Sequence, residues 1–221
     1  MDLAIDKFDK ERFGLITGSK CSVLFPKAEL MPSKISVGQD TYARQLAVQL
    51  YFEHYDEIST WVLEHGQYSE NGAFEHYYKF YSDKIERGFW KKKGNCGGTS
   101  DAVCPEYGVD FKCPTTLENW SDYMFDGIDK QQSHQAQMYM YLFDKPKWKT
   151  CIYLTETQRM TDFGLVYPVP EPKRMIIIEV EKEIGWAEKL EVTAPKIISK
   201  RDEYFGLLEA RFGKKQMPVR I

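Results

Sequence analysis

A chain of 221 residues is long enough to bury one sizeable core and short for two, so we expect a single domain spanning residues 1–221. Hydrophobic residues make up 43% of the chain and aromatic residues 14%, a composition that excludes a disordered protein. The net charge of −3 argues against a protein that coats nucleic acid non-specifically, but it allows an enzyme with a local basic track.

Two further features of the composition concern location and redox state. No apolar run approaches the ~18 residues of a membrane helix, and residues 1–7 lack the basic and then apolar order of a secretion signal. We therefore expect a cytoplasmic protein without a membrane partner. The cysteines are odd in number and form no C-x-x-C pair, which predicts free, mostly buried thiols rather than a disulfide framework or a zinc ribbon.

The first part of the chain predicts helices. Residues 11–25 combine an arginine and small residues with a following apolar run, which is typical of a loop that enters a short helix. Apolar residues at helical spacing between 40 and 55 predict a long amphipathic helix. A second helix is expected over about 68–81.

Glu70 stands out on this second helix because it shares a face with apolar residues. The residues three, four, seven and eleven positions later are Ala73, Phe74, Tyr77 and Tyr81. An ionised carboxylate on a core-facing stripe is costly unless it is paired or binds a metal ion. We therefore expect a cation beside Glu70.

Residues 98–112 have the pattern of a β-hairpin, with two short strands joined by a tight connection near Pro105. Asp110 and Lys112 share one face of the second strand. A turn centred just after Pro105 places Asp101 opposite Asp110 with β-carbons ~5 Å apart, and a turn one residue later places it opposite Lys112. Two carboxylates this close repel each other unless a cation lies between them, and oxygen ligands suit Mg²⁺ or Mn²⁺. The hairpin therefore predicts the metal site of a phosphodiesterase.

Two helices are expected after the hairpin. Thr115, with Glu118 three residues later, has the arrangement of a capping box and predicts a helix over 117–126. Helical spacing of apolar residues predicts another over 130–143.

The last part of the chain predicts strands and a closing helix. Strands are expected over 149–154 and 174–180, and the apolar, β-branched run 175–178 is typical of a central strand. A closing helix is expected over about 182–212, interrupted near Pro195. The order of elements indicates a mixed α/β domain with helices packed on one sheet.

Four segments, in this order, resemble the motifs of the lambda-phage exonuclease family, the YqaJ-type viral recombinases of the PD-(D/E)XK nuclease superfamily. The first is an Arg-to-Ser segment at 12–19, and the second is a helix at 66–73 with an acid four residues after glycine. The third is a paired acidic signature at 99–101 and 110–114, which ends in Cys-Pro, and the fourth is a glutamine helix at 135–139. Each motif alone is weak, whereas four in the correct order and spacing are specific. The chain departs from the commoner pattern with Asp110 in place of glutamate, with Thr-Ser before Asp101 and with Ala102 after it.

The resemblance, which covers about residues 11–155, implies a restriction-endonuclease-like core with a mixed central β-sheet flanked by helices. It implies a Mg²⁺- or Mn²⁺-dependent 5′ to 3′ exonuclease that degrades one strand of linear double-stranded DNA. The 3′ single-stranded tails would serve phage-type recombination by strand annealing. A homo-trimer, a single-strand annealing protein as partner and, for a phage-encoded chain, the host-cell cytoplasm belong to the same implication. The alternatives are a structure- or sequence-specific DNA endonuclease of the superfamily and a DNA-binding protein without activity.

The resemblance also implies roles for the hairpin residues. The implied metal ligands are Asp101, Asp110, the backbone carbonyl of Phe111 and Glu70, which together hold two ions. Lys112 is implied to polarise or deprotonate the attacking water. The structural alternatives are an ion pair of Lys112 with Asp110 alone, and a pairing of Glu70 with a lysine or arginine.

The remaining implied site residues lie outside the hairpin strands. Gln137, or Gln135 two residues earlier, is implied to orient the water or the scissile phosphate, and the sequence leaves both open. Arg12, Ser19 and Thr99 are the candidates for gripping a 5′-terminal phosphate, because arginine and hydroxyl donors suit phosphate oxygens.

Overall fold

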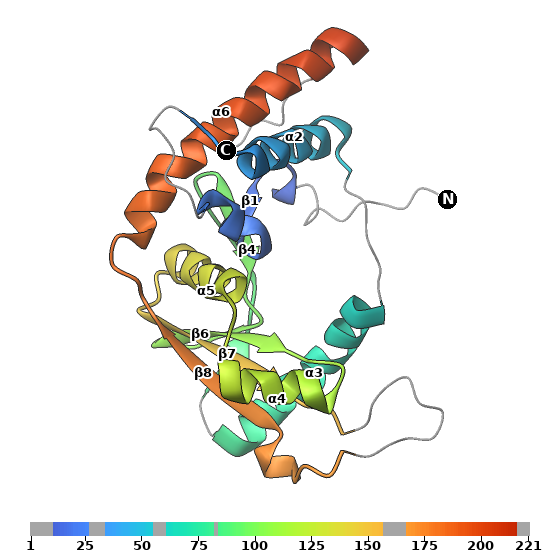
Figure 1. Ribbon diagram of the computed structural model, residues 1–221, viewed down its shortest axis with the longest axis vertical. Helices are drawn as coiled ribbons and strands as arrows, with labels where there is room; N and C mark the ends of the chain where they lie inside the picture. Colours follow the sequence, from blue (N-terminus) through green and yellow to red (C-terminus); the bar gives the residue numbers. More distant parts are fainter. Residues whose placement is uncertain (1–10, 27–33, 55–60, 82–83, 157–166, 216–221) are drawn as a thin grey trace. The chain divides into compact units, whose positions relative to one another are not determined.

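A computed structural model of the chain describes residues 11–26, 34–54, 61–81, 84–156 and 167–215 (Figure 1). Residues 1–7, on which the expected lack of a secretion signal rests, lie outside these ranges. Within the described part, no helix is long and apolar enough to cross a membrane.

The chain divides into two compact units. The first consists of Met1–Glu57, Lys92–Gly97 and Gly185–Ile221, and the second of Ile58–Lys91 and Gly98–Ile184. The expectation of one domain over 1–221 stays a prediction.

The first unit is built on two helices that lie side by side, α2 (Val37–Phe52) and α6 (Trp186–Phe212) (Figure 1). The apolar stripe predicted on the first of them is buried, at Ala43, Leu46, Ala47 and Leu50, and the last two pack with an aromatic cluster that includes Phe205. A short strand, β1 (Ile16–Thr17), pairs in parallel with the start of β4 (Cys96–Thr99), and a 3₁₀ helix, η1 (Gly18–Leu24), follows β1. The short helix predicted within 11–25 is therefore confirmed, whereas the strand β1 lies within the segment predicted as a loop. The sheet order is β1-β4-β3, with β3 at Trp90–Lys93.

The predicted interruption of the closing helix at Pro195 is wrong. The helix begins at Trp186 and continues through the proline to Phe212. Its buried stripe runs on both sides of the proline, with Leu190 before it and Ile197 after it. Packing of one continuous apolar face therefore outweighs the ~3 kcal/mol that a proline costs in a helix interior.

The second unit contains a five-stranded mixed sheet. Its strands follow the order β2-β5-β6-β7-β8, namely Glu86–Arg87, Ala102–Val103, Tyr107–Lys112, Lys147–Tyr153 and Met175–Glu181. Strands β5 and β6 form the predicted antiparallel hairpin, while β6 and β7 run parallel and β7 and β8 antiparallel.

The strand β8 was expected to be central, and this expectation is wrong because β8 is the last strand of the order. Its apolar run has another cause. Ile176 and Ile178 pack against the cluster of Trp120, whereas Ile177 packs against a cluster on the opposite face. An edge strand whose two faces are both covered has the composition of a central one.

Three helices pack on this sheet, α3 (Trp61–Tyr81), α4 (Leu117–Asp126) and α5 (Lys130–Phe143). The bounds of α4 and α5 are those predicted, whereas α3 begins before the predicted residue 68. The capping box at Thr115 and Glu118 is wrong by one residue, because Thr116 caps α4 by accepting a hydrogen bond from the Asn119 amide at 3.1 Å.

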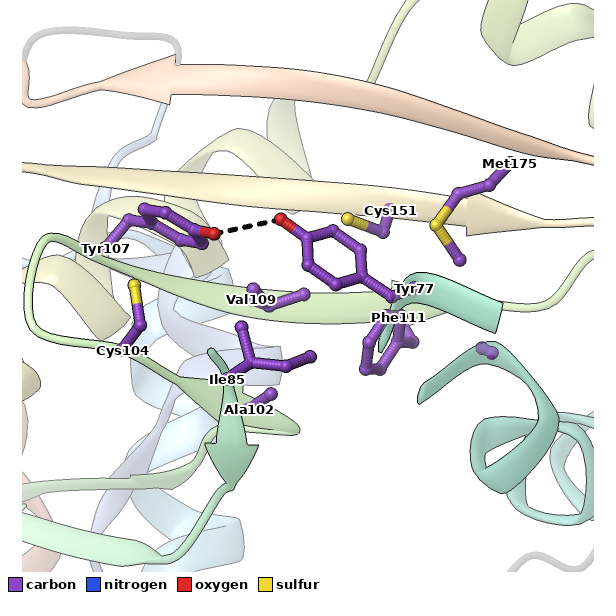
Figure 2. Packing of buried hydrophobic residues seen from close by; sticks show 10 residues of the cluster. Tyr77, Ile85, Ala102, Cys104, Tyr107, Val109, Phe111, Cys151 and Met175 are labelled. Carbon is purple, nitrogen blue, oxygen red and sulfur yellow. Dashed lines mark hydrogen bonds between the residues drawn. The ribbon is translucent and has the colours of Figure 1, made fainter. Parts of the chain in front are cut away.

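Helices α3 and α5 cover opposite faces of the sheet. Tyr77 of α3 lies in a buried cluster with Val109 and Phe111, and its hydroxyl is 3.0 Å from that of Tyr107 (Figure 2). On α5, the Tyr139 ring packs against Trp148, the partner of Gly108 in the β6–β7 register. Since adjacent residues of a strand point to opposite faces, the even-numbered residues of β6 lie on the α5 side.

That face requires a glycine at position 108. A β-carbon at Gly108 would lie 2.0 Å from the Trp148 ring, closer than any side chain tolerates. The buried Trp148 indole therefore takes the space of a side chain at 108 and supports α5 above the strand.

Candidate active site

The hairpin register brings the two aspartates together. Ala102 pairs with Val109, so that Asp101, the residue before, lies opposite Asp110, the residue after. This is the first of the two registers that the sequence allowed. The Asp101 carboxylate accepts a hydrogen bond from the Phe111 amide at 2.6 Å, which ties it to β6.

Lys112 lies between an acid and an amide. Its Nζ is 2.7 Å from Asp110 Oδ2 and donates to Gln135 Oε1 at 3.3 Å. Burial lowers the pKa of Lys112, but the Asp110 carboxylate more than offsets this, so that the pKa is raised above its usual value. The lysine is therefore an ammonium ion when only protein groups surround it.

The two candidate glutamines have different neighbours. Gln135 faces Lys112, and its Nε2 donates to the Tyr139 hydroxyl at 3.1 Å, which fixes the amide with its oxygen toward the lysine. Gln137 instead donates to the Glu181 carbonyl at 2.7 Å and accepts from the Glu183 amide at 3.0 Å. The structure therefore brings Gln135 to the hairpin lysine and uses Gln137 to join α5 to the end of β8.

Tyr139 is a site residue that sequence reasoning missed as such. Its position four residues after Gln135 places both on one side of a helix. That spacing was available in the sequence, but an aromatic residue on a core stripe gave no sign of a polar role.

Glu70 lies at the edge of the buried face of α3 rather than on it. The buried residues are Ser69, Ala73, His76 and Tyr77, whereas the Glu70 side chain keeps 42% of its exposure. The expected cation beside Glu70 is a basic side chain in this structure.

That side chain is Arg87 on the edge strand β2, at 3.9 Å from Glu70 Oε1. The guanidinium also donates to Asn71 Oδ1 at 2.8 Å and stacks over the Phe74 ring at 3.9 Å. Sequence reasoning missed Arg87, because a strand of only two residues has no alternation to detect.

The carboxylates of this site disfavour each other's ionisation. Burial, followed by the charges of Asp110 and Glu70, raises the pKa of Asp101 well above its usual value. Burial also raises the pKa of Glu70, against the opposing effect of Arg87. Such a site is a place where a cation is favourable.

The donors near Asp101 suit one divalent ion of the magnesium type. Asp101, Asp110 and the Phe111 carbonyl supply oxygen atoms only. Among the described residues, no group of three or more His, Cys, Asp or Glu side chains is spaced to hold a metal ion. Asp101 and Asp110 thus supply oxygen atoms of the kind that Mg²⁺ prefers without a third acidic ligand in place, whereas Glu70 is turned to Arg87.

The cysteines take no part in a disulfide. All five are free, four are buried, and Cys113 at the edge of the site is half-buried. Burial raises the pKa of the Cys113 thiol to about 12, with contributions from the nearby carboxylates. The prediction of free, mostly buried thiols is confirmed.

The candidates for phosphate binding are divided between the two units. Arg12 and Ser19 line one cavity of about 170 Å³ in the first unit, which also contains Lys20 and Tyr42. Thr99 is an exposed residue of β4 in the second unit and does not line that cavity.

Three solved structures are similar to this chain. The alkaline exonuclease LHK-Exo from Laribacter hongkongensis matches with a TM-score of 0.72 at 14% identity, covering 91% of this chain and 94% of its own. LHK-Exo in complex with dAMP matches with a TM-score of 0.71 at 15% identity, with coverage of 91% and 95%. A phage-related exonuclease from Haemophilus somnus 129PT matches with a TM-score of 0.69 at 14% identity, with coverage of 89% and 96%.

Comparisons with protein-family models and with curated protein sequences found no match. The structural likeness extends over nearly the whole chain, at an identity that shows the fold alone. The predicted fold class is confirmed: the chain has a mixed α/β fold with a restriction-endonuclease-like core, similar in fold to these exonucleases.

Proposed function

We propose that this chain is a divalent-metal-dependent DNA exonuclease that removes nucleotides in the 5′ to 3′ direction from one strand of linear duplex DNA. The observation that carries the proposal is the position of Lys112, 2.7 Å from Asp110 and hydrogen-bonded to Gln135, with Asp101 on the neighbouring strand. The fold shared with exonucleases supports the same reading.

The chain's own residues would divide the work of hydrolysis. A Mg²⁺ or Mn²⁺ ion held by Asp101 and Asp110 would stabilise charge on the scissile phosphate. Offsetting the carboxylate charges would weaken the hold of Asp110 on the Lys112 proton, which lets Lys112 polarise or deprotonate the attacking water. Gln135 would orient Lys112 or the water through its fixed amide oxygen. Glu70 would join a second ion only by leaving Arg87.

The substrate side of the proposal rests on two observations. One of the similar structures was solved in complex with dAMP, a deoxynucleoside monophosphate. In this chain, Arg12 and Ser19 share a cavity whose cationic and hydroxyl donors suit a terminal 5′-phosphate. A homo-trimer, a cytoplasmic location, a single-strand annealing partner and a role in phage-type recombination are part of the proposal through the family resemblance alone.

Three DNA substrates test the reaction. Linear duplex with 5′-phosphate, linear duplex with 5′-hydroxyl and closed circular duplex are each incubated with Mg²⁺, and the released nucleotides and remaining strands are measured. We expect digestion of the linear molecules from their 5′ ends, with release of mononucleotides, and survival of the complementary strand as a single-stranded 3′ tail. Cutting of the circle would instead identify an endonuclease, and no digestion of any substrate would indicate a DNA-binding protein.

A further inference from the structure

The second unit contains a cavity with basic and aromatic walls, which has no part in the candidate active site. It has a volume of about 340 Å³ and lies beside the connection of the β5–β6 hairpin. Its side-chain walls include three lysines, two phenylalanines and one acid, namely Lys84, Lys91, Lys145, Phe89, Phe143 and Glu86. We call this cavity the Phe89 pocket.

The lining charges of the Phe89 pocket favour an anion. Lys145 donates to the carbonyl oxygens of Cys104 at 2.6 Å and of Pro105 at 3.1 Å, which holds the ammonium group in place without cancelling its charge. Lys91 has a partial counter-charge in Asp144 at 3.4 Å. Three lysines against one lining acid leave the pocket positive, as a phosphate-binding surface requires.

The aromatic wall adds a planar, apolar surface. The Phe89 side chain is 53% exposed and contacts the buried Phe143 ring edge-on, with centroids 5.4 Å apart. An exposed ring inside a positive pocket suits a ligand that is both planar and anionic. A nucleotide of a single DNA strand has these two properties, because its base stacks on aromatic rings while its phosphate binds lysine.

The pocket and the hairpin carboxylates lie on the same face of the sheet. Phe143 and Tyr139 of α5 both pack on Trp148, and Tyr139 in turn holds Gln135 beside Lys112. Gln135 and Phe143 are separated by two turns of one helix, a distance of ~12 Å. Three to four stacked nucleotides, at ~3.4 Å each, span that distance.

We propose that the Phe89 pocket binds a single DNA strand that extends from the hairpin site. One base of the strand stacks on Phe89, and the phosphates of the strand lie beside Lys84 and Lys91. This assignment rests on the proposed function, since it takes DNA as the substrate. It adds a strand-holding site a few nucleotides from the place of cleavage.

Binding is tested without cleavage, by fluorescence anisotropy of a labelled oligothymidine in EDTA. The variants are Phe89→Ala, which removes the stacking surface, and Lys84→Glu, which reverses one charge and keeps the ring. Matched controls are Phe125→Ala, an aromatic residue of α4 with 80% exposure, and Lys173→Glu in an exposed 3₁₀ turn. We expect each pocket variant to weaken binding by at least about fivefold, the lower end for loss of one stacked base, while the controls bind as wild type.

Wild-type affinity in both pocket variants, or an equal loss in the controls, would overturn the assignment. Digestion of linear duplex by the wild-type chain is measured separately in Mg²⁺. If the wild-type chain digests DNA and the variants bind the oligonucleotide as wild type does, the pocket assignment is refuted and the nuclease proposal stands. If binding depends on Phe89 but the wild-type chain digests no DNA, the nuclease proposal is refuted and the pocket stands as a binding site for single-stranded DNA.

Discussion

Lys112 Nζ lies 2.7 Å from Asp110 Oδ2, and both side chains project from the same face of β6. The pair is shielded from water, with 27% of the lysine side chain and 9% of the aspartate side chain exposed. An ion pair in such surroundings holds its proton firmly, because separating the charges leaves each poorly solvated. In the proposed reaction, Lys112 would therefore act on water only when another positive charge offsets that of Asp110.

Lys112→Ala is expected to abolish DNA cleavage while DNA binding in EDTA persists, because the change removes the group that we propose activates water. Lys112→Arg separates the two roles considered for this residue. Arginine keeps the ion pair with Asp110 but does not give up its proton. If the arginine variant digests linear duplex at the wild-type rate, Lys112 does not deprotonate the attacking water.

The two glutamines are expected to respond in opposite ways. Gln135→Ala removes the acceptor for Lys112 and is expected to lower kcat by roughly 10²-fold with little change in melting temperature. Gln137→Ala leaves the Glu183 amide and the Glu181 carbonyl without their partner, at a cost of ~1–3 kcal/mol, and is expected to lower the melting temperature by several degrees. Steady-state rates per folded molecule, with thermal melts of both variants, check this. A stable, inactive Gln137→Ala variant would reverse the assignment.

Local signals explain what the sequence predicted well. Helices α4 and α5 begin and end at the predicted residues, although the cap of α4 is Thr116 rather than Thr115, and the hairpin follows from Pro105 and the alternation around Asp110. These signals act over a few residues, so they are legible without knowledge of the rest of the chain.

Apart from the local errors at Pro195 and Thr115, what the sequence misjudged or left open concerns relationships between distant segments. The edge position of β8 depends on which strands pair, and the partner of Glu70 depends on a two-residue strand that brings Arg87 to α3. The choice between Gln135 and Gln137 depends on which side of α5 meets β6, since neighbouring positions of one helix differ by only part of a turn. None of these is encoded in local spacing.

Asp101→Asn is expected to stabilise the protein at neutral pH without metal. The folded-state pKa of Asp101 is raised above its unfolded value of ~3.9, so ionisation costs stability as the pH rises from that value through the folded pKa. Asparagine removes this cost and still accepts from the Phe111 amide. Melting temperatures in EDTA are expected to rise by roughly 2 °C or more at pH 7, with no gain at pH values below the unfolded pKa.

Magnesium provides the reverse test of the same residue. Mg²⁺ is expected to raise the melting temperature of the wild-type chain and to have a much smaller effect on Asp101→Asn, because the proposed ion would bind only the folded site and would use Asp101 as a ligand. Asp122→Asn, a change at an exposed acid of α4, is the control and is expected to follow wild type. In EDTA at pH 7, an Asp101→Asn protein that melts below wild type would contradict the charge repulsion assigned to Asp101.

Arg87→Gln is expected to increase the affinity of the metal-free protein for Mg²⁺. Arg87 lies 3.9 Å from Glu70 and is anchored by Asn71 and Phe74, so its charge opposes a divalent ion at the same carboxylates. Removing one unit charge at ~4 Å from a divalent ion is worth ~2 kcal/mol where water screens it, roughly a thirtyfold change in affinity. Calorimetric titration without DNA measures this directly. Lys79→Gln is the matched control and is expected to leave the affinity unchanged. Lys79 is an exposed lysine of α3, the helix of Glu70, and it pairs with Glu171 at 2.8 Å. An unchanged or weaker affinity in Arg87→Gln would show that Arg87 does not compete with the ion for Glu70.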